Sequence, residues 1–209
     1  MDRRQLLQQG GAAALGALAI GAVAGGATPA EAESLWSATP PPHAHKKLPN
    51  PARTPVPDPP FPKGLTSQEL RELKKFDHLD FVVFSKQEWS RLGETHAHDI
   101  RVHMADGTYT DGLPAHIASL KQLFSFAPDT HISEHPIRIA AGGFTAVTGV
   151  MRGTFTKPLT TPQGTVPPNG KKYAINMVTV GVWNKHETMD EEWLFWDNQS
   201  FFQQLGVGA

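Results

Sequence analysis

The chain has 209 residues, enough for one domain, or two small ones, with a hydrophobic core. Lys and Arg number 19 against 20 Asp and Glu, so the net charge is −1. This balance argues against a nucleic-acid or anionic-membrane partner, since proteins that bind either usually carry a basic excess. The chain has no cysteine. Disulfide scaffolds, thiol nucleophiles and cysteine zinc sites are therefore excluded.

The first 32 residues have the features of an export signal. A pair of arginines, Arg3-Arg4, precedes an uncharged stretch from Gly10 to Ala27 that is mostly Gly and Ala, and Ala30-Glu31-Ala32 offers a small-x-small cleavage site. The stretch is too weakly hydrophobic for a stable membrane anchor. It resembles a twin-arginine signal, with an ordinary secretory signal or a retained anchor as alternatives. We expect the mature protein to be periplasmic or secreted, outside the cytoplasmic membrane of a bacterium, with no membrane contact after cleavage.

Residues 33–64 are predicted to be a linker. Ten of the 18 prolines lie between Pro40 and Pro62. Because proline fixes φ and has no amide proton, such a segment should be extended and poorly packed. His43 and His45 lie within it and are interpreted as part of a solvated spacer. Residues 65–209 then form a single domain.

Helices are predicted first along this domain. Residues 66–69 have the capping-box pattern before a helical run, and residues 85–88 repeat that pattern before a second one. Residues 98–104 alternate between apolar and polar, which predicts a half-buried strand. Asp106-Gly107 is a hairpin-turn signal leading to Tyr109, and Pro114 suits the first turn of a third helix.

The rest of the domain is strand-like. Strands are expected over 132–139 and 144–155, and again over 172–185 and 189–197, with a loop over 157–170. Three helices followed by a run of antiparallel strands indicate an α+β fold, with the helices packed on one face of a curved sheet.

The last predicted strand contains the most informative candidate for chemistry. Period-two alternation places Glu191, Trp193, Phe195 and Asp197 on one face. A carboxylate aligned with aromatic residues on a concave sheet would be partly desolvated, which raises its pKa and suits it to acid–base catalysis near neutral pH. The alternative is that Asp197 ends the strand and binds backbone amides.

Histidines form the second candidate. His96-Ala97-His98-Asp99, with His103 further along, supplies imidazoles and a carboxylate, a plausible metal set. In a regular strand, however, His103 lies on the face opposite His98, and no other spaced ligand completes the set. We therefore predict no metal and no organic cofactor, with a metal enzyme using His96, His98 and His103 as an alternative. His135 is interpreted as a surface or packing residue.

Three stretches together resemble the SnoaL-like polyketide cyclases, also described as ester cyclases. The first is the acidic, Trp-containing strand at 191–198 with Gln204-Leu205-Gly206 after it. The second is the strand and Asp-Gly turn of residues 99–112. The third is Phe126-Ala127-Pro128-Asp129, followed at a distance by residues 167–171. The resemblance covers about residues 66–209.

The resemblance implies a cone-shaped α+β barrel, similar to nuclear transport factor two, in which three helices back a strongly bent antiparallel sheet around an apolar pocket. It also implies a homodimer and ring closure by intramolecular aldol condensation without a cofactor. In that family an Asp in the last strand moves the proton, and here the position is Asp197. The family's histidine in the penultimate strand has no counterpart, because that region offers Trp183 and Asn184.

The sequence therefore predicts an exported, cofactor-free enzyme that performs acid–base chemistry, such as aldol-type cyclisation or isomerisation, on a small apolar carbonyl compound. Asp197 is the expected proton-transfer residue, with His98 and His103 at the pocket wall. The alternative is a module of the same fold that binds a small molecule without catalysis. The expected substrate-binding residues are Trp183, Trp193, Phe195, Tyr109 and Met177.

Overall fold

The computed structural model describes residues 59–161 and 164–207. The predicted export signal and most of the predicted linker lie outside the described residues. The end of that linker contacts the domain: the Arg138 guanidinium donates a hydrogen bond of 3.0 Å to the Pro59 carbonyl and lies 5.0 Å from the centre of the Phe61 ring. Within the described residues, we find no helix with the length and apolar character needed to cross a membrane.

The first helix of the described residues, α2 (Ser67–His78), begins as predicted. Thr66 is its N-cap; its hydroxyl accepts the Glu69 amide proton while the Glu69 carboxylate accepts that of Thr66. The helix continues directly into a π-helical segment, η2 (Leu79–Phe84), which was not predicted. This unpredicted segment forms part of the candidate site.

The prediction of the second helix is wrong in the type of helix and in the residue that caps its start. The structure has a short 3-10 helix, η3 (Trp89–Glu94), in place of a helix capped by Ser85. Ser85 instead ends η2, where its hydroxyl donates to the Asp80 carbonyl at 2.6 Å. The third helix, α3 (Leu113–Phe126), has Pro114 in its first turn, as predicted.

The strands form one large sheet and one small hairpin. The sheet runs in the order β2-β1-β9-β8-β5-β3, with β4 also paired to β5. Its strands are β1 (His96–Met104), β2 (Tyr109–Asp111), β3 (His131–Ile132), β4 (Ile137–Ala141), β5 (Phe144–Thr154), β8 (Lys172–Trp183) and β9 (Met189–Trp196). The hairpin of β6 (Leu159–Thr161) and β7 (Gly164–Val166) occupies the predicted loop.

Two features of the sheet differ from the prediction. The strand expected over 132–139 is split into β3 and β4, because Pro136 has no amide proton to donate to a ladder. The sheet is also mixed, since β1 runs parallel to β9 while the other paired strands are antiparallel. A last helix, α4 (Asn198–Leu205), follows β9 and was not predicted.

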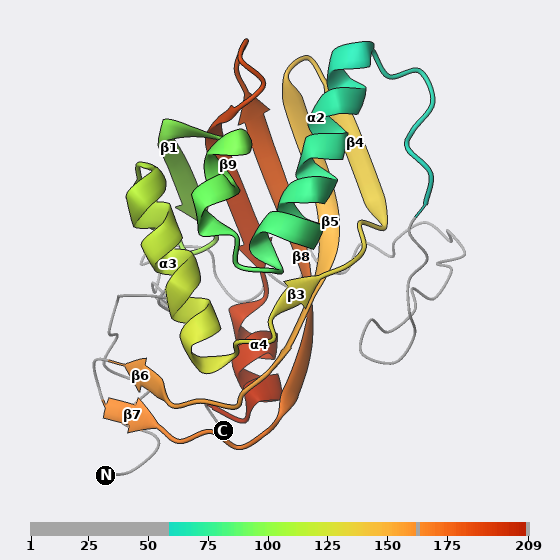
Figure 1. Cartoon of the computed structure of the whole chain (residues 1–209). Coiled ribbons are helices and arrows are strands. Elements are labelled where there is room, and N and C mark those ends of the chain that lie inside the picture. Colours follow the sequence, from blue (N-terminus) through green and yellow to red (C-terminus); the bar gives the residue numbers. More distant parts are fainter. Residues whose placement is uncertain (1–58, 162–163, 208–209) are drawn as a thin grey trace, which may run out of the picture.

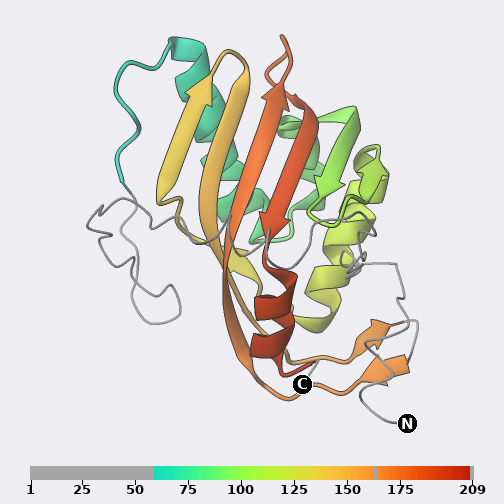
Figure 2. The ribbon, with the colours of Figure 1, turned by 180° about the vertical axis from the view of Figure 1, so that it is seen from behind.

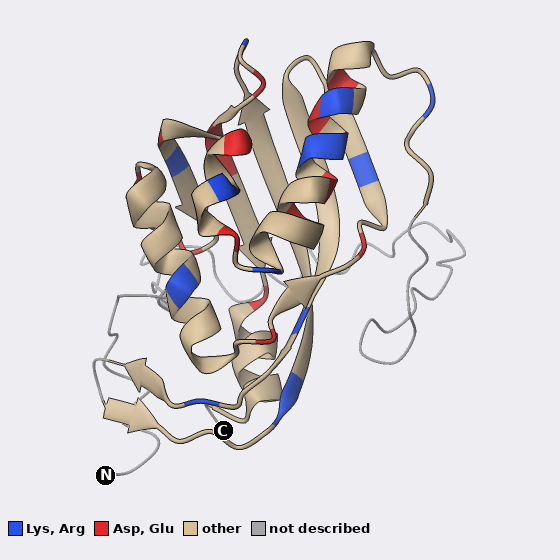
Figure 3. Ribbon diagram, viewed as in Figure 1, with Lys and Arg blue, Asp and Glu red and all other residues tan. Residues whose placement is uncertain are grey.

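Helices cover one face of the sheet. Figure 1 shows α2 and α3 in front of the strands, and Figure 2 shows the opposite face, where the strands are open to view and α4 lies at one end. The α+β class and the helix-backed curved sheet are thus confirmed. Basic and acidic residues are interspersed along the ribbon in Figure 3, in keeping with the small net charge.

The outer face of the sheet carries exposed apolar side chains. They come from strands across the sheet: Tyr109, Ile137, Ile139, Phe144, Val178, Trp193 and Phe195. The inner face packs against the helices, where the buried side chains form two clusters, one centred on α3, β5 and β8 and the other on α2, β1 and β9. The space between the sheet and the helices holds the candidate site.

Candidate functional site

A cavity of about 60 Å³ lies between the helical layer and the inner face of the sheet, with room for a few water molecules. Most of its wall is apolar. The apolar residues are Leu79, Phe84, Leu92, Leu120, Leu123, Ile132, Met151, Met177, Leu194 and Trp196. The polar ones are Asp80, His96, His116, Thr179 and Glu192. A few polar groups on an otherwise apolar wall are typical of a small-molecule site.

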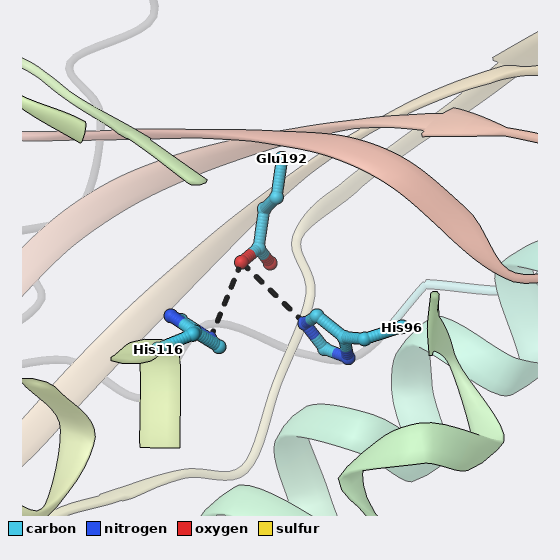
Figure 4. A group of neighbouring side chains, drawn as sticks. All are labelled: His96, His116 and Glu192. Atoms are coloured by element: carbon cyan, nitrogen blue, oxygen red, sulfur yellow. Dashed lines mark ion pairs between the residues drawn. The ribbon is translucent and has the colours of Figure 1, made fainter. Parts of the chain in front are cut away.

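Three of the polar side chains converge on one point of the wall (Figure 4). One Glu192 carboxylate oxygen, Oε2, lies 3.5 Å from His96 Nε2 and 3.6 Å from His116 Nε2. All three residues are buried, with at most 4% of each exposed. Both separations exceed the usual 2.7–3.2 Å of a hydrogen bond, so the three groups surround a shared point at longer range.

The parallel pairing of β1 with β9 builds this group. His96 begins β1 and pairs with Met189, but the register shifts before Arg101, so that Val102 pairs with Glu192. Along β9 the exposed side chains are those of Asp190, Trp193 and Phe195, whereas Glu192 and Leu194 are buried on the inner face. His116 comes from the N-terminal part of α3, which lies over this edge of the sheet.

Contacts of Nδ1, the ring nitrogen that faces away from Glu192, fix the orientation of His96. Its Nδ1 lies 3.1 Å from the Leu92 carbonyl oxygen and 2.9 Å from the Thr95 hydroxyl. With its proton on Nδ1, His96 donates to the Leu92 carbonyl oxygen, which only accepts; with its proton on Nε2, Nδ1 accepts from the Thr95 hydroxyl. His96 Nε2, the atom that faces Glu192, is buried and has no hydrogen-bond partner among the described residues.

Burial and charge act in opposite directions on this group. Burial raises the pKa of the Glu192 carboxyl, but the facing imidazoles of His96 and His116 outweigh it and lower that pKa below its ordinary value. Burial lowers the pKa of His116 to about 4, and Glu192 only partly opposes that shift. At neutral pH the site therefore holds a carboxylate beside a neutral His116.

A second carboxyl, Asp80 of η2, lines the cavity from the helical layer. Burial raises its pKa, and a hydrogen bond from His135 opposes the rise without cancelling it. His135 has no exposed surface; its Nε2 lies 2.8 Å from Asp80 Oδ2 and its Nδ1 lies 2.7 Å from Asp77 Oδ1. Arg138 completes this hydrogen-bond network by donating two hydrogen bonds to Asp77, of 2.9 and 3.0 Å.

This network gives His135 a strongly altered pKa. Burial alone would lower it, but the hydrogen bonds and charges of Asp77 and Asp80 raise it to about 9. His135 is therefore a buried cation at neutral pH, paired with two aspartates. The prediction that it is a surface or packing residue missed this role.

Asp197 lies elsewhere than predicted. Its side chain is exposed and caps α4: one carboxylate oxygen accepts the Ser200 amide proton at 3.1 Å and the other accepts the Ser200 hydroxyl proton at 2.6 Å. These hydrogen bonds lower its pKa, where the sequence predicted a rise from desolvation. The prediction that the Asp197 carboxylate is desolvated is thus wrong. The alternative, that Asp197 ends the strand and binds a backbone amide, describes its contacts.

The other predicted site residues are spread over the molecule. His98 is exposed, while His103 stacks on Trp193 with ring centres 3.7 Å apart and pairs with Glu191 at 2.9 Å on the outer face. Tyr109 and Phe195 are exposed on that outer face too. Trp183 is buried, but its indole donates to Thr145 outside the cavity wall. Only Met177 of the predicted set lines the cavity.

The alternative metal set of His96, His98 and His103 is not brought together, because only His96 faces inward. The donors that do meet are His96, His116 and Glu192, whose ligand atoms all lie within 4.8 Å of one another. Sequence reasoning missed His116 and Glu192 because it chose the wrong face of β9. The alternation of Glu192 with Leu194 and Trp196 on the other face was the available signal.

The comparisons with known proteins agree with this architecture. The family model of the SnoaL-like polyketide cyclases matches residues 78–205, more than half of the chain. The chain belongs to this family. A search of curated proteins gave no significant match to this SnoaL-like protein.

Solved structures show the same fold. IdmH of Streptomyces antibioticus, a candidate polyketide cyclase, is 23% identical with a TM-score of 0.56, covering 66% of this chain and 99% of its own. A SnoaL-like protein of Jannaschia sp. CCS1 is 15% identical with a TM-score of 0.59, covering 72% and 100%. A candidate polyketide cyclase of Xanthomonas campestris is 16% identical with a TM-score of 0.58, covering 66% and 99%. The family suggests cyclase- or isomerase-type activity without a cofactor.

Proposed function

We propose that this SnoaL-like protein is an enzyme that moves a proton on a small, largely apolar carbonyl compound held in the cavity, as in an aldol-type cyclisation or an isomerisation. The observation that carries the proposal is a buried carboxyl, Asp80, on the wall of a mostly apolar cavity. Family membership supports the reaction class. The size of the cavity, about 60 Å³, supports a small substrate.

The proton-transfer role moves from Asp197 to Asp80. General acid–base catalysis is most effective when the pKa of the group lies near the working pH. Burial raises the pKa of Asp80 toward that range, while capping contacts lower the pKa of the exposed Asp197. His135 holds one oxygen of Asp80, which fixes the orientation of the carboxyl toward the cavity. The same logic applies to ketosteroid isomerase, in which an Asp serves as the base in an apolar site.

The remaining polar wall can orient the substrate. His96, His116 and Glu192 come from β1, α3 and β9, while Asp80 comes from η2. A carbonyl oxygen directed at the imidazoles would leave the adjacent C–H group in the space that Asp80 borders. The apolar residues of the cavity would hold the hydrocarbon part and exclude water.

The test uses acetone, a ketone small enough for the cavity, as a probe, with exchange of its α-hydrogens in D₂O followed by proton NMR. The wild-type protein should accelerate exchange, and Asp80→Asn should reduce that acceleration by about 100-fold or more. Asparagine keeps the size of the side chain and can still accept the hydrogen bond from His135. Asp197→Asn is the matched control and should retain full activity. Equal exchange by wild type and Asp80→Asn, with both folded by circular dichroism, would contradict the proposal.

If the wild-type protein accelerates no exchange on acetone or on other small ketones such as butanone, the alternative of a binding module is favoured instead. Isothermal titration of the same ketones distinguishes this outcome, because a binding module would bind them without turnover. Wild type and Asp80→Asn would then bind equally.

Export and dimerisation are also part of the proposal. The predicted signal supports an exported protein, periplasmic or secreted, and the absence of cysteine is compatible with an oxidising compartment. The exposed apolar residues on the open face of the sheet support a homodimer, because monomers rarely leave large apolar patches in water.

A further inference from the structure

We propose that His96, His116 and Glu192 form a binding site for one divalent first-row transition metal ion. The proposal uses the same cavity as the proposed function but does not depend on proton transfer by Asp80. It departs from the expectation of a cofactor-free protein, and it rests on the geometry of these three side chains.

Two of the three ligand separations fit a single ion, and all the ligand atoms lie within 4.8 Å of one another. Nitrogen and oxygen ligands lie about 2.0–2.2 Å from zinc, and at tetrahedral angles two such ligands are about 3.4 Å apart. Glu192 Oε2 lies 3.5 and 3.6 Å from the two imidazole nitrogens, too far for good hydrogen bonds and close to this separation. The three side chains point toward the same space in Figure 4.

The surroundings of His96 provide an independent observation. Histidine ligands usually donate their other ring N–H to a carbonyl or carboxylate, which fixes the ring and directs the free nitrogen at the metal. His96 Nδ1 lies 3.1 Å from the Leu92 carbonyl oxygen, to which it can donate, and its Nε2 is buried, aimed at Glu192 and without a hydrogen-bond partner among the described residues. A buried imidazole nitrogen left in this way is costly unless a ligand binds it.

The donor set selects the kind of metal. Two imidazole nitrogens and one carboxylate oxygen suit Zn²⁺, Fe²⁺, Co²⁺ and similar ions, whereas Mg²⁺ and Ca²⁺ prefer oxygen ligands. Three protein ligands leave a coordination position open, as in catalytic rather than structural zinc sites. The three residues line the cavity, so that position faces the space where a small molecule would bind. A metal ion there would polarise a carbonyl oxygen bound to it.

The chain supplies a matched control for the test. Glu191 and His103 form a second carboxylate–imidazole pair on the same two strands, 2.9 Å apart, but on the outer face and part-exposed. Glu191→Gln and Glu192→Gln are the same chemical change at neighbouring positions. Only Glu192→Gln removes a ligand from the proposed site.

The experiment is isothermal titration of ZnCl₂ into the full-length protein after treatment with a chelator. Wild type and Glu191→Gln should each bind one zinc ion per chain. Glu192→Gln should bind zinc at least about 100-fold more weakly, because the loss of a group that only hydrogen-bonds to a ligand already lowers metal affinity by about 10–100-fold. Absence of one-to-one binding by wild type overturns the proposal. Equal binding by Glu192→Gln also overturns it, because the zinc would then be held by other histidines.

A second measurement covers the case in which Glu192→Gln does not fold. CoCl₂ added to the wild-type protein should produce the intense visible absorption of four- or five-coordinate cobalt, and one equivalent of Zn²⁺ should remove it. Weak absorption like that of aqueous cobalt would overturn the proposal. Both readouts are independent of turnover, so a failed ketone-exchange assay and a failed metal titration remain distinguishable.

Discussion

The charge of the buried His135 should make the stability of this protein depend on pH in the neutral to alkaline range. Hydrogen bonds to Asp77 and Asp80 raise its pKa from the ordinary 6.5 to about 9. That difference corresponds to about 3 kcal/mol of stabilisation of the charged form. Because the folded chain binds this proton more tightly than the unfolded one, the stabilisation is complete below pH 6.5. It is lost as the pH rises through 9.

His135→Gln removes this titration. At pH 6 the variant should be less stable than wild type by about 3–5 kcal/mol, because Asp77 and Asp80 lose a buried cationic partner. The difference should shrink by about 3 kcal/mol between pH 6.5 and 9.5, because wild type itself loses the charge in that range. His98→Gln, at an exposed position, is the control and should follow wild type at every pH.

Urea unfolding followed by tryptophan fluorescence measures these free energies, and the chain contains five tryptophans. Subtracting the free energy of unfolding of the variant from that of wild type cancels the contributions of the histidines whose pKa is the same in both proteins. A difference that stays constant from pH 6 to 9.5 would show that His135 is not a buried cation, as would a variant as stable as wild type at pH 6.

Two further predictions concern the end of β9 and the outer face of the sheet. Asp197→Ala should lower the free energy of unfolding, measured in urea, by about 1 kcal/mol. Asp197→Asn should change it little, because Asn and Asp are equally good N-caps. Equal effects of the two substitutions would argue against a capping role. In light scattering, wild type should have the mass of a dimer and the double variant Ile139→Lys, Phe144→Lys that of a monomer, since both side chains are exposed on the open face. A wild-type monomer would rule out the dimer.

Local signals predicted much of the fold correctly. The capping box at Thr66, the Asp106-Gly107 turn and Pro114 each act through contacts a few residues apart, and all three occur where expected. The pattern at Ser85 failed because Ser85 ends η2, where its hydroxyl binds the Asp80 carbonyl, and because that hydroxyl also binds the strand start at Ile132, a partner that only the folded chain brings close. Long-range contacts therefore overrode a local preference.

The candidate site was harder to predict for the same reason. Period-two alternation shows that β9 has two faces, but both carry acidic and aromatic residues, so the pattern does not determine which face is inner. That choice is made by the parallel partner β1, which begins more than 90 residues earlier in the chain, at His96 against Met189. His116 gave no signal of its own, since a histidine on a helix becomes a site residue only when Glu192 is placed beside it.

The position of β9 in the sheet makes it the strand that joins two otherwise separate parts. In the described chain β9 is the last strand to be synthesised, yet it lies between β1 and β8. Until it docks, the β1–β2 hairpin and the group of β3, β4, β5 and β8 share no ladder, and each presents an unpaired edge. Pairing of β9 with β1 and β8 joins these two parts, covers both edges and brings Glu192 to His96. Completion of the sheet and formation of the cavity wall therefore depend on the same strand, and a chain in which β9 is unpaired would present edges prone to aggregate.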